Sequence, residues 1–152
     1  MSSQTSGGKY DSGYDDMSKR GKAREIALQT LYAAEVSQST WQKALKDNIA
    51  RRKASEDAAE YAEKLVKAVM EEKDRLDEMI SKRLENWELK RVSVVDKNIL
   101  RIALVELLFC PEVPPLVIIN EAIELARTFS SHEAGRFVNG ILDTLAREVR
   151  GI

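Results

Sequence analysis

The sequence predicts an all-α protein, a compact bundle of about six to seven helices. Hydrophobic residues make up 43% of the 152 residues and charged residues 32%, but aromatic residues only 6%. That balance is more typical of helical bundles than of sheets, which are rich in β-branched and aromatic residues. Apolar residues recur at spacings of three and four, without the alternation that strands require. The length of the chain predicts a single domain.

The chain is predicted to begin with a disordered leader over residues 1–17, followed by a helical domain over 18–152. Ser, Gly, Asp and Tyr dominate the leader, which has almost no aliphatic residues. Such a segment buries too little apolar surface to offset the entropy that ordering removes. We therefore expect the folded domain to start where the helical spacing starts, at Ser18.

Three helices are predicted in the first half of the domain. Apolar residues at helical spacing predict one helix over 18–36, and a polar run separates it from a shorter helix over 41–53. Ser55 is typical of an N-cap, and two acidic residues follow it in the first turn, where they favour the helix dipole. A long third helix is therefore expected over 56–84.

Three further helices are predicted in the second half. Ser93, with Asp96 three positions later, resembles a capping box at the start of the fourth helix. The body of this helix is apolar nearly all round, so we expect it at the centre of the bundle. The prolines within 111–115 end it. The fifth helix is expected around 119–126 and the last around 134–149.

The residues that metal sites and nucleophilic catalysis need are scarce. His132 is the only histidine and Cys110 the only cysteine, so neither a zinc site nor a Cys-His nucleophile can form within one chain. Catalysis by carboxylates alone stays open. The sequence has no glycine-rich phosphate loop. We predict a protein without enzymatic activity, cofactor or metal.

The sequence also favours a cytoplasmic location without a membrane segment. The single cysteine cannot form an internal disulfide. No apolar stretch is long and charge-free enough to span a bilayer, and residues 1–16 lack the apolar core of a secretory signal. A reducing compartment agrees with all of these features.

The start of the first predicted helix is a candidate binding site. The net charge of −1 excludes bulk attraction to nucleic acid, so a nucleic-acid site has to be local. Gln29 and Tyr32 follow one or two turns later, and a tyrosine beside cations suits single-stranded RNA. An ordinary solvated basic turn and a tyrosine packed in the core remain the alternatives. The cations, with little acid nearby in sequence, are Lys19, Arg20, Lys22 and Arg24.

Five segments resemble the NusB family in content, order and spacing. The resemblance implies a bundle in two helical halves that binds single-stranded boxA RNA of ribosomal RNA leaders. It also implies two partners, the ribosomal protein NusE and a transcription elongation complex with RNA polymerase, and a role in antitermination. A helical adaptor that binds only protein is the alternative. The segments are Arg20–Tyr32, Asp96–Leu107, Val113–Pro114, Ile119–Ala126 and Arg136–Asp143.

The resemblance also implies which residues contact RNA. Besides the basic start of the first helix and Tyr32, it points to Glu133, Arg136 and Phe137, around the turn before the last helix. A family position on the third helix falls near Arg75, which replaces an aromatic residue.

Two glycines fall inside the last predicted helix. Each costs up to about 1 kcal/mol relative to alanine at such a position. Close packing of helices or close approach of RNA would explain them. We expect packing to explain Gly140, which precedes the core residue Ile141, and leave both explanations open for Gly135.

Overall fold

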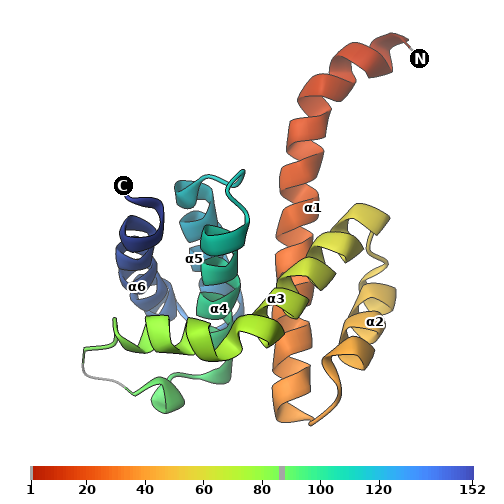
Figure 1. Cartoon of the computed structure of the whole chain (residues 1–152). Coiled ribbons are helices and arrows are strands. Elements are labelled where there is room, and N and C mark those ends of the chain that lie inside the picture. The colour runs from red at the N-terminus through yellow and green to blue at the C-terminus, as the bar shows by residue number, and fades with distance from the viewer. Residues whose placement is uncertain (1, 86–87) are drawn as a thin grey trace.

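The computed structural model describes the backbone of residues 2–85 and 88–152 and, within these ranges, the side chains from Lys19 onwards. The described residues form six α-helices and one short 3-10 helix, with no strand among them, which confirms the all-α class (Figure 1). None of the described helices is long and apolar enough to cross a membrane. The elements are α1 (Ser2–Val36), α2 (Trp41–Arg52), α3 (Glu56–Ser81), η1 (Leu89–Arg91), α4 (Val94–Phe109), α5 (Pro115–Phe129) and α6 (His132–Arg150).

Local capping sets most of the helix boundaries. At the start of four helices, a Ser or Thr side chain accepts a hydrogen bond from a backbone N–H of the first turn. Lys53 adopts a left-handed conformation and ends α2. The predicted boundaries are confirmed to within a few residues, except that α1 begins at Ser2 and not at residue 18; α3 ends at Ser81, before the predicted end. The four capping residues are Thr40, Ser55, Ser93 and Ser131.

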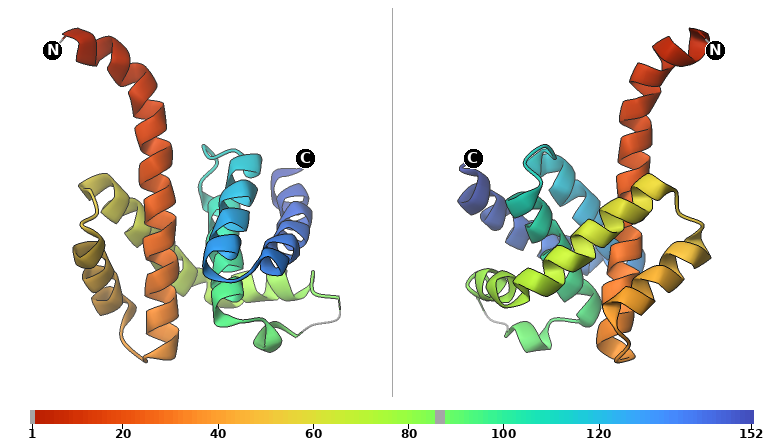
Figure 2. Two further views of the ribbon diagram at one scale, coloured as in Figure 1. Left: turned by 180° about the vertical axis from the view of Figure 1, so that it is seen from behind. Right: turned by 45° about the vertical axis from the view of Figure 1, so that its right-hand side comes forward.

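The helices form two halves that share the long helix α3. Helices α1 and α2 lie on one side of the molecule and α4, α5 and α6 on the other, while α3 crosses α1 and then runs beneath α4 and α6 (Figures 1 and 2). Helix α4 contacts α1, α3, α5 and α6. The side chains of α4 from Asn98 to Leu107 are all buried. This confirms the prediction that the fourth helix lies at the centre of the bundle.

The loop between α4 and α5 is fixed by the last residue of α6. The guanidinium of Arg150 donates hydrogen bonds to the carbonyl oxygens of Glu106, Leu107, Cys110 and Val113, at 2.7 to 3.1 Å. These carbonyls lie in the last turn of α4 or beyond it, where a helix leaves acceptors without helical partners. Those of Glu106 and Cys110 also accept a backbone N–H. Arg150 therefore adds hydrogen bonds to this turn and joins the end of α6 to the proline-rich loop.

The leader predicted over 1–17 coincides with the first part of α1. In the structure, α1 begins at Ser2 and projects beyond the rest of the bundle (Figure 1). The side chains of residues 1–18 lie outside the described residues. The division of the chain at residue 18 therefore stays a prediction.

The packing explanation for Gly140 is wrong. Gly140 is exposed, and a Cβ atom built on it meets no heavy atom within 4 Å. Gly135 is the closely packed glycine, because a Cβ there would lie 3.2 Å from Cγ of Arg127 on α5. Close packing of α6 on α5 thus accounts for Gly135, and no packing contact accounts for Gly140.

Candidate nucleic-acid interface

Arg24 is a buried structural residue. Only 3% of it is exposed, and its Nε and Nη2 atoms each donate to one carboxylate oxygen of Glu106 at 2.8 Å. Nη1 donates to Glu121 at 3.2 Å. Burial opposes the charged form, but the hydrogen bonds and attraction of Glu106 outweigh it, so the pKa of Arg24 is raised. Arg24 was predicted to contact RNA with the other cations of the basic run, but its buried, paired side chain does not fit that role.

Lys19 and Arg20 also meet acidic residues, which come from distant parts of the chain. Lys19 lies 3.1 Å from Asp57 on α3, and Arg20 lies 3.4 Å from Glu112 in the α4–α5 loop. Both pairs are partly exposed to solvent, and such pairs contribute only about 0 to 1 kcal/mol. An incoming phosphate can therefore compete for these two cations, whereas the buried pair of Arg24 stays closed to it.

Lys22, Gln29 and Tyr32 form what we call the outer stripe of α1. Their spacings of seven and three residues place them on one face of the helix. Tyr32 is 43% exposed, so the alternative of a tyrosine packed in the core is wrong. The side-chain oxygen of Gln29 accepts a hydrogen bond from Arg52 at 3.0 Å. Arg52 is also paired with Glu25 at 2.6 Å, so the end of α2 places an ion pair beside the stripe.

The outer stripe lines one hollow, and a second hollow is lined by neighbouring segments. The first is lined by Gln29 and Tyr32 with Arg51 of α2 and Phe129 at the end of α5. The second lies between the starts of α4 and α6. The two linings come from neighbouring parts of the chain, since Val95 and Phe129 belong to the first and Asp96 and Ser131 to the second. The second hollow is lined by Arg91, Val92, Ser93, Asp96, Ser131, Glu133, Ala134 and Phe137.

The fold thus brings two predicted regions to one face, although they are about a hundred residues apart in sequence. Tyr32 belongs to the first hollow, and Glu133 and Phe137 belong to the second. Arg136 is exposed on the same turn of α6. Aromatic rings from α1, α5 and α6 therefore line neighbouring depressions, with arginines at their edges.

Arg75 does not join this face. It is an exposed residue of α3 whose guanidinium lies 5.9 Å from the ring of Phe109, at the far end of α4. Val95 and Phe109 are separated by about 21 Å along the helix, at 1.5 Å per residue. The structure therefore separates Arg75 from the hollow that contains Tyr32.

Several residues of this surface were missed by the sequence reasoning. The basic run at 51–53 was interpreted only as the end of a helix, yet Arg51 and Arg52 lie beside the outer stripe. Phe129 carried no signal beyond its place before a turn. Tyr61 and Lys64, which lie beside Arg20, looked like ordinary members of α3. Of these residues, only those of the basic run could have been identified from the sequence as candidates for RNA binding.

The described residues contain no group of three or more His, Cys, Asp or Glu side chains that could hold a metal ion. His132 is exposed at the start of α6, and Cys110 is fully buried at the end of α4. His132 is therefore a surface residue, and Cys110 is a small core residue.

Comparisons with known proteins assign the family. The model of the NusB family matches residues 21–147. The transcription antitermination protein NusB of Syntrophus aciditrophicus is 41% identical over 135 residues, which cover 89% of this chain and 84% of that protein. The protein of the same name from Bacillus cereus is 40% identical over 127 residues, with 84% and 96% covered.

Solved structures agree with the sequence comparisons. NusB of T. maritima shares 36% identity with a TM-score of 0.80, over 85% of this chain and 91% of that one. A structure of the antitermination factors NusB and NusE in complex with dsRNA matches at 28% identity with a TM-score of 0.80, over 87% and 98%. These relatives are named as transcription factors rather than enzymes, which confirms the prediction of a non-enzymatic protein. The chain belongs to the NusB family of transcription antitermination proteins.

Proposed function

We propose that this antitermination factor binds the single-stranded boxA element of ribosomal RNA leaders together with NusE, in the cytoplasm. The observation that carries the proposal is the shared face of the outer stripe and the two hollows. Three aromatic side chains from α1, α5 and α6 lie there with arginines beside them. Single-stranded RNA is commonly held by this combination, since bases stack on rings while cations take the phosphates.

The second hollow also offers a way to recognise a base. One carboxylate oxygen of Asp96, Oδ1, is buried and has no hydrogen-bond partner among the described residues. Glu133 and the ring of Phe137 line the same hollow. Carboxylates accept hydrogen bonds from the exocyclic amino groups of bases. We infer that a base stacked near Phe137 donates to these carboxylates, and sequence preference follows from that contact.

The family supports NusE as the protein partner. The related structure of NusB and NusE with dsRNA contains both proteins and an RNA. In the proposal, NusE adds its own RNA contacts and raises the affinity of the joint complex through effective concentration. The complex then remains attached to the elongating RNA polymerase without any bond chemistry by this chain.

The test is binding of fluorescent boxA RNA, measured by anisotropy with and without NusE at several salt concentrations. A scrambled strand and a boxA duplex serve as competitors. We expect boxA to bind more tightly than both, and NusE to strengthen the binding. Each phosphate contact should contribute about 0.7 to the slope of log affinity against log salt.

Two substitutions probe the outer stripe. Tyr32→Leu should remove one stacked base, worth about 1 to 3 kcal/mol, without changing the slope. Lys22→Gln should lower the slope by about 0.7. Lys46→Gln, on the exposed side of α2, is the matched control and should change neither. Equal binding of boxA and the scrambled strand, together with NusE binding that ignores RNA, would instead favour a protein-only adaptor.

A further inference from the structure

The ring of Tyr61 is held rigidly between α1 and α4. Its hydroxyl donates to Glu106 at 2.5 Å and lies 3.7 Å from the sulfur of Cys110. Glu106 is only 1% exposed and is fixed in turn by Arg24. Burial and the charge of Glu106 raise the pKa of Tyr61, so its hydroxyl keeps the proton that it donates.

This ring holds two cations from different helices. The guanidinium carbon of Arg20 lies 4.8 Å from the ring centroid, and the ammonium of Lys64 lies 6.0 Å from it. Both distances fit cation–π contacts, which stabilise a cation by about 0.5 to 1 kcal/mol at exposed sites. Lys64 is exposed and forms no ion pair within the described part of the chain. Its charge is therefore available to an anion.

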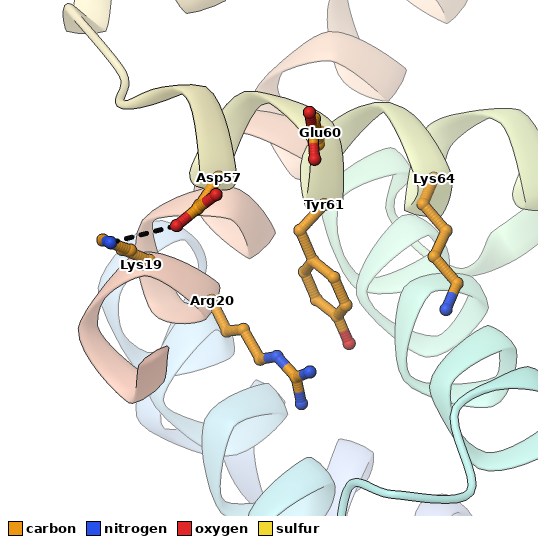
Figure 3. A pocket seen from close by; sticks show the side chains of 6 residues that line it. All are labelled: Lys19, Arg20, Asp57, Glu60, Tyr61 and Lys64. Atoms are coloured by element: carbon orange, nitrogen blue, oxygen red, sulfur yellow. Dashed lines mark hydrogen bonds and ion pairs between the residues drawn. The ribbon is translucent and has the colours of Figure 1, made fainter. Parts of the chain in front are cut away.

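The two cations face a hollow of about 400 Å³ between α1 and α3, which we call the Tyr61 hollow (Figure 3). Arg20, Tyr61 and Lys64 converge on this space in the figure. Two acidic residues also line it, but Asp57 is paired with Lys19 at 3.1 Å. The lining residues are Lys19, Arg20, Asp57, Glu60, Tyr61 and Lys64, which carry one net positive charge.

We propose that the Tyr61 hollow binds a backbone phosphate of the RNA, held between Arg20 and Lys64. The inference rests on the proposed function and extends the RNA contacts from α1 onto α3. A phosphate would relieve the repulsion between two neighbouring cations and replace the weak, exposed pair of Arg20 with Glu112. An RNA strand that is bound at Lys22 reaches the hollow by crossing α1, which is about 10 to 12 Å wide with its side chains.

Tyr61 acts in this proposal as a positioning residue. Its ring keeps both cations oriented when Arg20 leaves Glu112, and its hydroxyl is fixed by a carboxylate that RNA cannot reach. Pre-orientation reduces the entropy that the two long side chains lose on binding. The buried network around Arg24 therefore supports RNA binding without touching RNA.

The test compares Lys64→Gln with Lys67→Gln, an exposed lysine one turn further along α3 and outside the hollow. Binding to boxA RNA in the presence of NusE is measured over a range of salt. Lys64→Gln should lower the affinity, because the phosphate loses one of its two cations, and Lys67→Gln should leave the affinity unchanged. Both are surface changes, and thermal unfolding checks that each variant keeps the stability of the wild type.

A double-variant comparison tests whether Arg20 and Lys64 act on the same phosphate. Removing Lys64 in an Arg20→Gln background should lower the affinity by a smaller factor than in the wild type, because the two cations share one phosphate. A wild-type affinity in Lys64→Gln, or the same decrease in Lys67→Gln, overturns the inference while the proposed function stands. Failure of the wild-type protein to prefer boxA overturns the proposed function and the inference with it.

Discussion

Replacement of Arg24 by methionine separates a structural role from an RNA contact. Arg24 looks like part of a basic RNA-binding run in sequence, but its side chain is paired with Glu106 inside the bundle. Arg24→Met keeps an unbranched side chain of similar length and removes the charge. We expect Glu106 to be left as a buried carboxylate with only the hydroxyl of Tyr61 beside it.

The expected loss of stability is large. Removing one partner of a buried ion pair costs about 3 to 5 kcal/mol, because the other charge stays buried without compensation. The third contact, with Glu121, adds little, because that carboxylate is 37% exposed. For a chain of this size, the loss corresponds to a decrease in melting temperature of about 6 to 20 °C.

Urea unfolding, followed by circular dichroism, measures this loss. The double variant Arg24→Met with Glu106→Leu is the control, since it removes both charges. Apolar replacement of a whole buried pair is often neutral or stabilising, so the double variant should recover most of the lost stability. A loss below about 1 kcal/mol in Arg24→Met would refute the buried-pair argument. So would a double variant that is less stable than the single one.

Two further predictions concern Glu35 and the glycines of α6. Burial opposes ionisation of Glu35, but hydrogen bonds from Lys97 and Asn98 outweigh it and lower its pKa from the ordinary 4.5. Because the pKa is lowered, ionised Glu35 stabilises the folded state at pH values above 4.5. The stability advantage of the wild type over Glu35→Gln, measured by urea unfolding, should therefore shrink as the pH falls below 4.5. A constant advantage would contradict this. Gly140→Ala should stabilise α6 by up to about 1 kcal/mol. Gly135→Ala should gain less stability, because its new Cβ atom crowds Arg127. Equal gains in stability for the two variants in thermal unfolding would be evidence against that crowding.

The amino-acid sequence alone determined the helices and the centre of the bundle. Ser55 and Ser93 were recognisable as N-caps because the side chain of a cap bonds to the backbone three residues later. The burial of α4 followed from its apolar residues on every face. These features depend on neighbours within one or two turns, so they can be predicted without knowledge of the fold.

The candidate interface could be predicted only in part. Tyr32 was found from its place after the basic run, and Glu133 and Phe137 were found through the family resemblance; in the fold all three line hollows. Arg75 lies elsewhere, and the leader over 1–17 stays a prediction. Gly140 was assigned to packing because it precedes Ile141, but consecutive residues of a helix point about 100° apart.

The tertiary structure decided which cations face solvent. Arg24 and Lys22 lie two positions apart in one basic run, yet Arg24 meets Glu106, 82 residues away, and Lys22 belongs to the outer stripe. The placement of Arg20 and Lys64 around Tyr61 likewise depends on how α1 crosses α3. Contacts between helices are set by crossing angle and rotation, which local periodicity does not contain.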